Sequence, residues 1–217
     1  MREGDLEGNL LSVIGNAGGK DLLQEAAEFS LDAVLGDGIV KDIPVVGTVA
    51  KLYGAAVGLQ GYVFVKKVRR FLTELSAIPQ SKRDEFARRL DSDREQRERT
   101  ADVLVTLLDK MDDTAKAPLL ARAFSRYVQG EFDFSTFQRL AAAVDRCLVD
   151  DLPALEKIEL KPAVLDEYVG DLLVSAGLAG IRAIPTIRGP GAKTTYGLSE
   201  LGELFLQVVV RGRSRSD

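Results

Sequence analysis

Histidine, the side chain most often used as a general base, metal ligand or pH switch, is absent from this sequence. Histidine-dependent catalysis is therefore excluded, and cysteine is the next residue to consider. The single Cys147 cannot form an internal disulfide, and it lies in an apolar helical pattern over residues 140–148. A thiol in such a pattern usually packs as a small hydrophobic group. We predict no catalytic residue and a reducing compartment.

A glycine-rich stretch, Gly15-Asn-Ala-Gly-Gly-Lys-Asp21, superficially resembles a phosphate-binding loop. Such a loop needs four residues between its first glycine and the Gly-Lys pair, whereas Gly15 leaves three. Asp21 also replaces the Ser or Thr that would bind Mg²⁺, and its carboxylate would repel a triphosphate. The pattern favours a linker between two short helices, and we predict no nucleotide and no other cofactor.

Paired carboxylates occur at Asp91 and Asp93 and again at Asp112 and Asp113, and such pairs are candidates for binding a divalent cation. A calcium loop requires glycine at its sixth position and glutamate at its twelfth. The sixth position counted from Asp91 is Gln96. These aspartates are better explained as N-terminal helix caps, and we predict no metal site.

The most hydrophobic stretch of the chain covers residues 43–65, where Lys51 is the only charge. About 20 apolar residues suffice to cross a bilayer, and Gly54 and Gly58 have the spacing that lets helices approach closely. Lys51 opposes insertion, because a lysine near the centre of a span costs roughly 2.5–3.5 kcal/mol. Three interpretations remain open: a buried hairpin or central helix, a segment that contacts a membrane, and a self-association helix.

A basic flank follows this segment and would suit anionic headgroups. The predicted membrane or partner contact consists of Gly47, Lys51, Gly54, Gly58, Gly61, Lys66, Lys67, Arg69 and Arg70.

Helical periodicity dominates the rest of the chain. Apolar residues at helical spacing predict an amphipathic helix over residues 20–35 and a succession of helices from Ser81 to about residue 158. In the last sixty residues a helix over 162–176 is followed by β-branched residues, a Gly/Pro turn at 188–193 and a final helix. The predicted fold class is mainly α: a helical bundle over 1–158, and a module over 159–217 that contains one β-hairpin and can draw helices from 133–158.

The C-terminal module carries a family resemblance. Leu172-Leu-Val-Ser-Ala-Gly-Leu178, the hairpin, and Tyr196-Gly-Leu-Ser-Glu-Leu-Gly202 follow one another in the order found at the end of a winged-helix domain. The stretch resembles small bacterial regulators, with Ser199 where the family usually has threonine. The resemblance implies a recognition helix, a wing and duplex DNA as partner.

The charges of this module decide between DNA and protein as its partner. Bases and phosphates are met by Arg, Lys, Asn or Gln, and the basic residues available are Lys161, Arg182, Arg188 and Lys193. The recognition helix itself offers Asp166, Glu167 and Asp171. Because an acidic helix is repelled by the major groove, a protein-contact or packing role is favoured over DNA binding.

The net charge of −4 gives no general attraction to nucleic acid or lipid. The polar, acidic first residues do not resemble a secretory signal, so we expect a cytoplasmic protein, with peripheral or conditional contact with the inner membrane as an alternative. The first 160 residues resemble only uncharacterised bacterial helical proteins, some from phage-defence loci. We expect a non-enzymatic protein acting through membrane or partner-helix contact of residues 43–65. Homo-oligomerisation is one form of that contact, and a winged-helix transcriptional regulator is the alternative.

Overall fold

The computed structural model describes residues 42–43, 59–183 and 194–212. Its longer helices are α6 (Leu59–Leu75), α7 (Gln80–Asp91), α8 (Arg94–Lys110), α9 (Lys116–Val128) and α10 (Phe134–Arg146). The C-terminal part comprises the short 3₁₀ turn η2 (Val149–Asp151), α11 (Pro153–Lys157), α12 (Glu167–Ser175), the hairpin strands β1 (Ala179–Ala183) and β2 (Thr194–Leu198), α13 (Glu200–Phe205) and a π-helical turn η3 (Leu206–Val210). A mainly α fold with one C-terminal β-hairpin is thus confirmed.

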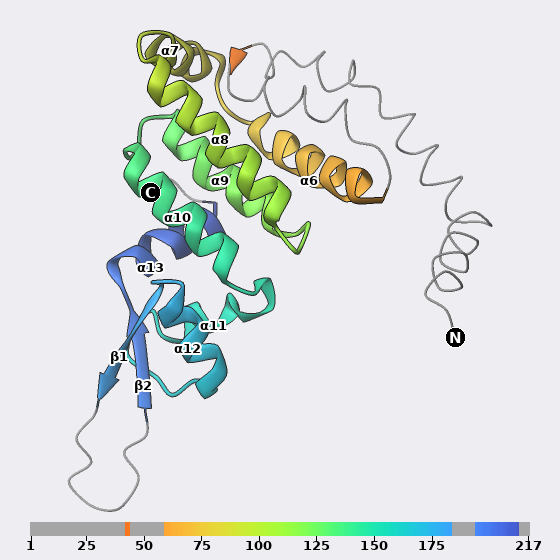
Figure 1. Ribbon diagram of the computed structural model, residues 1–217. Helices are drawn as coiled ribbons and strands as arrows, with labels where there is room; N and C mark the ends of the chain where they lie inside the picture. Colours follow the sequence, from red (N-terminus) through yellow and green to blue (C-terminus); the bar gives the residue numbers. More distant parts are fainter. Residues whose placement is uncertain (1–41, 44–58, 184–193, 213–217) are drawn as a thin grey trace, which may run out of the picture.

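Helix α9 is the centre of the bundle. It packs against α6, α10 and η3, and most of its side chains are buried, with Leu120, Phe124 and Tyr127 among them. Aromatic rings surround these residues, for example the Phe137 ring, which stacks on Tyr127 with centroids 5.4 Å apart. Figure 1 shows α8, α9 and α10 side by side, with the hairpin at the opposite end of the molecule from α7. The buried side chains form one continuous cluster from α6 to η3.

The helix starts follow from local hydrogen bonding, as the capping interpretation of the aspartates predicts. Asp93 caps α8 by accepting a hydrogen bond from the Gln96 backbone N–H at 2.9 Å. Asp133 caps α10 in the same way through Thr136. Asp113 accepts from the backbone N–H of Ala115 at 2.7 Å just before α9. These side chains satisfy backbone donors that lack a partner in the first helical turn.

The C-terminal part is built around the hairpin. β1 and β2 pair antiparallel, with Ile181 opposite Tyr196, and Ala163 bridges to Tyr196 on the other edge of β2. Helix α12 packs against β1, and it also approaches β2 closely, because a Cβ on Gly170 would overlap the Tyr196 ring. The strands occupy 179–183 and 194–198, so pairing begins two residues before the β-branched stretch that predicted it.

No helix within the described residues is long and apolar enough to cross a membrane. The N-terminal half of the predicted membrane segment, including Gly47, Lys51, Gly54 and Gly58, lies outside those residues. Gly61 lies in α6.

Candidate interaction surfaces

The basic flank of the hydrophobic segment is divided between the surface and the interior. Lys66, Arg69 and Arg70 are exposed on α6, whereas Lys67 is only 4 % exposed. The Lys67 ammonium donates hydrogen bonds to the backbone carbonyls of Asp109 at 2.8 Å and Met111 at 2.9 Å. Burial lowers the pKa of Lys67, and the nearby aspartates oppose that shift. Lys67 therefore caps the C-terminus of α8, where carbonyls lack intrahelical partners, and is not part of the exposed flank.

The same packing brings the exposed Arg70 into contact with the turn between α8 and α9. Arg70 donates from its Nη1 to the Thr114 hydroxyl at 3.1 Å, which places the turn between α8 and α9 beside α6. That turn contains Asp112 and Asp113. Asp113 accepts a hydrogen bond from the Ala115 backbone N–H, and Asp112 forms an ion pair with Lys116.

A second buried lysine ties this turn to α10. Lys116 is buried, and its Nζ lies 2.8 Å from Asp112 Oδ1 and 2.9 Å from the Asp145 carbonyl oxygen. The hydrogen bond from Lys116 lowers the pKa of Asp112. Both buried lysines thus donate hydrogen bonds to backbone carbonyls at helix ends.

Cys147 lies fully within the core, and burial raises the pKa of its thiol to about 11. Since the thiolate is the reactive form, the native protein is expected to resist Ellman's reagent at pH 8. In 6 M guanidinium chloride the same thiol should react with one equivalent within minutes. Stoichiometric reaction of the native protein at that fast rate would show that the thiol is accessible.

The ends of the hydrophobic segment are attached to the bundle. Ile43 is fully buried, and Asp42 pairs with Arg83 of α7 at 3.5 Å. At the other end, Phe64 and Val68 are buried on the core side of α6.

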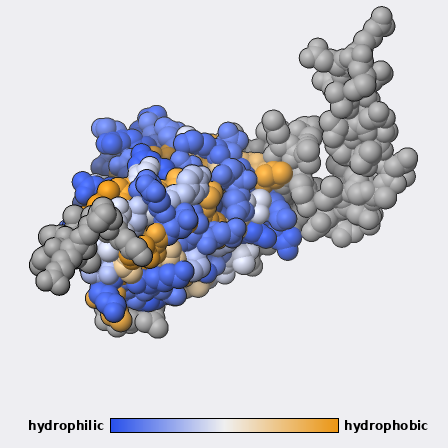
Figure 2. Space-filling model, turned by 90° about the horizontal axis from the view of Figure 1, so that it is seen from below, coloured by the Kyte–Doolittle hydropathy of each residue, from blue (hydrophilic) through white to orange (hydrophobic). Residues whose placement is uncertain are grey.

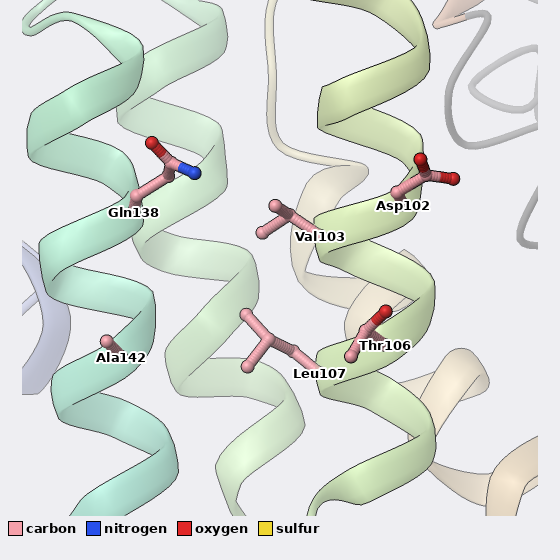
Figure 3. Close-up of a pocket in the computed structure, with 6 residues that line it drawn as sticks. All are labelled: Asp102, Val103, Thr106, Leu107, Gln138 and Ala142. Atoms are coloured by element: carbon pink, nitrogen blue, oxygen red, sulfur yellow. The ribbon is translucent and has the colours of Figure 1, made fainter.

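An apolar groove of about 330 Å³ lies between α8 and α10. Figure 3 shows Val103 and Leu107 of α8 directed across it towards α10. The remaining lining residues are Asp102, Thr106, Gln138 and Ala142. One carboxylate is the only ionisable group, so the groove offers no acid–base pair for catalysis. An apolar floor with a polar rim is the arrangement that receives side chains of a partner helix.

In the sequence, Val103 and Leu107 are apolar residues of the same predicted helix as Leu104 and Leu108. The structure buries Leu104 and Leu108 fully and leaves the other two half-exposed. The sequence signal that could have revealed this exposure is the width of the apolar face of α8, which is greater than one neighbouring helix can cover.

A smaller polar hollow, about 260 Å³, lies where α9 meets the C-terminal turn. Arg122 pairs with Glu74 at 2.8 Å and donates to the carbonyls of Val209 and Val210 at 3.1 Å. Arg126 pairs with Glu131 at 3.0 Å and also donates to the Gly212 carbonyl. Because both guanidinium groups bind protein acceptors, they hold the C-terminal turn to α9.

In the C-terminal module, Lys161 and Arg182 are exposed, and Arg188 and Lys193 lie outside the described residues. The solvent side of α12 carries Glu167, Tyr168 and Asp171. Helices α11 and α12 precede the hairpin, with the Ala163 bridge to β2 between them. The winged-helix assignment stays a prediction.

Within residues 42–43, 59–183 and 194–212, no group of Cys, Asp and Glu side chains could hold a metal ion. No family model, curated protein or solved structure matches this chain.

Proposed function

We propose that this chain is a non-enzymatic protein that acts by contacting a partner helix through its hydrophobic segment 43–65. The pattern of small residues at Gly54 and Gly58 supports close helix contact. The interior positions of Lys67, Lys116 and Cys147 support a role without catalysis, since these reactive side chains are occupied in packing. The apolar groove between α8 and α10 supports the same kind of function.

The observation that carries the choice of a protein partner is the attachment of both segment ends to the bundle. Crossing a bilayer would withdraw Ile43 and Phe64 from the core. Each such side chain contributes about 1.5–3 kcal/mol when buried, against a total stability of about 5–15 kcal/mol for a typical domain. A partner helix can contact the segment while Ile43 and Phe64 remain in the core.

Substitution of both Gly54 and Gly58 by leucine is expected to abolish the contact, because added side chains keep helix backbones apart. The measurement is the mass of the purified protein by light scattering, with flotation on anionic and neutral liposomes in parallel. We expect wild type to self-associate through this segment or to capture a helical partner, and the double variant to do neither. Ser81→Leu, on the exposed side of α7, is the control for an added leucine.

If wild type floats with liposomes and the glycine variant does not, the segment contacts a membrane and not a partner helix. Identical mass, partner capture and flotation for wild type and variant would remove the segment from the function altogether.

DNA binding by the C-terminal module is the alternative proposal. Exposed Lys161 and Arg182 support it, whereas the carboxylates of α12 oppose it. The balance of charge on the helix that would enter the groove favours protein contact.

A further inference from the structure

The outer edge of β1 has backbone groups that β2 does not use. The Tyr196 N–H and C=O are both hydrogen-bonded to Ala163, at 2.9 and 3.0 Å, on the far side of β2. In an antiparallel ladder the N–H and C=O of one residue point to the same side, so Tyr196 forms no bonds with its partner Ile181. The N–H and C=O of Ile181 therefore point away from β2, to the outer edge.

The neighbouring pairs agree with this pattern. The Ser199 N–H donates to the Leu178 carbonyl at 3.1 Å, which makes that pair hydrogen-bonded. Hydrogen-bonded and non-hydrogen-bonded pairs alternate along an antiparallel ladder. Gly180 and Arg182 therefore bond to β2, and the backbone groups of Ala179, Ile181 and Ala183 point outward. Among the described residues, none bonds to the backbone of Ile181 from outside the hairpin.

This edge also exposes an apolar side chain, because Ile181 is 57 % exposed. Figure 2 views the molecule from the end where the hairpin lies and shows hydrophobic surface among hydrophilic surface. An unpaired edge with an exposed β-branched residue is the type of surface that pairs with another strand.

Charge identifies the chemistry of the added strand. Residues 162–181 contain Asp166, Glu167 and Asp171 and no basic residue. Asp171 accepts a hydrogen bond from the Tyr196 hydroxyl at 3.1 Å, on the face of the sheet that Ile181 shares. Burial is the largest cause of the raised pKa of Tyr196. The hydrogen bond to Asp171 and the charge of Glu167 raise this pKa further.

The cation nearest to this edge in sequence lies on the opposite face. Arg182 follows Ile181, so its side chain alternates to the other side of the sheet, where it lies over Gly180 and Gly197. A strand placed beside Ile181 therefore meets carboxylates on one face. A second copy of this chain would bring the same carboxylates against them, which favours a different, basic partner.

We propose that the outer edge of β1 binds an extended, basic segment of a partner protein as an added strand. The backbone of Ile181 supplies the hydrogen bonds, its side chain supplies an apolar contact, and Glu167 and Asp171 attract basic side chains on the same face. This site is separate from segment 43–65, so its test is independent of the proposed function.

The test uses the full chain and two fluorescent peptides, acetyl-(Lys-Val)₃-amide and acetyl-(Glu-Val)₃-amide, followed by anisotropy. We expect the basic peptide to bind, with affinity that falls as salt is raised, and the acidic peptide not to bind. Ile181→Pro removes the outward N–H and should weaken binding about tenfold or more, whereas Ile181→Val should retain it. Circular dichroism checks that each variant is folded.

Glu167→Lys provides a second variant that leaves the strand unchanged. It should weaken binding of the basic peptide, while Glu95→Lys, a matched change in the first turn of the distant α8, should not. If Ile181→Pro fails to fold, this pair decides the question. Absence of basic-peptide binding, equal binding of both peptides, or binding unaffected by Glu167→Lys would overturn the proposal. Concentration-dependent dimerisation that Ile181→Pro abolishes would assign the edge to a second copy and would also overturn it.

Discussion

Replacing Gly202 with alanine is expected to lower the free energy of unfolding by about 2 to 4 kcal/mol. A Cβ at this position would overlap the carbonyl oxygen of Leu178, which is backbone and cannot rotate away. That oxygen accepts the hydrogen bond from the Ser199 N–H, and the Ser199 hydroxyl caps α13 by accepting from the Gly202 N–H at 2.9 Å. Any shift that relieves the overlap therefore strains the cap as well as the packing.

Urea denaturation of the full chain, followed by circular dichroism, measures this effect. Gly180→Ala is the matched control, since its Cβ would meet only the flexible Arg182 side chain at 3.8 Å. The control is expected to change stability by less than about 1 kcal/mol. Similar losses in both variants would show that the Gly202 contact is not the cause.

Replacing Lys67 with methionine should lower the free energy of unfolding by about 2 to 4 kcal/mol. Methionine fills a similar volume but cannot donate, so the part-buried carbonyl of Asp109 and the buried carbonyl of Met111 lose this donor. Lys82→Met is the control, because Lys82 forms an exposed pair with Glu85 and such pairs contribute about 0–1 kcal/mol. Equal effects of the two substitutions would mean that the buried hydrogen bonds of Lys67 contribute little.

The pH dependence gives Lys67 a second signature. Its pKa is lowered in the folded protein relative to the ordinary value of 10.5. As pH rises through the lowered pKa towards 10.5, the folded state releases this proton before the unfolded state does. The unfolded state then binds more protons, so the contribution of Lys67 to stability increases with pH in that window. The stability difference between wild type and Lys67→Met should therefore grow from neutral pH towards 10.5, and a constant difference would argue against a lowered pKa.

Local patterns in the sequence predicted the elements well. Helical periodicity and aspartate caps indicated the helices after Ser81, and Asp93 and Asp133 cap as that pattern implies. The β-branched residues and Gly/Pro turn indicated the hairpin, although it begins at Ala179. Such features depend on residues within a few positions of one another, which is why sequence alone suffices for them.

Long-range packing decided what the sequence could not. Lys67 and Asp109 are 42 positions apart, and only the contact between α6 and the end of α8 turns a predicted surface cation into a buried cap. The groove beside Val103 likewise depends on the spacing of α8 and α10 over α9.

The sequence by itself determined the mainly α fold class, the hairpin and the absence of histidine chemistry, because these follow from composition and local periodicity. Only the tertiary structure decided which cations are exposed and which strand edge has backbone groups without a hydrogen-bond partner in the hairpin. Those properties depend on how distant segments pack and on the register of β1 against β2, and neither is encoded in the spacing of neighbouring residues.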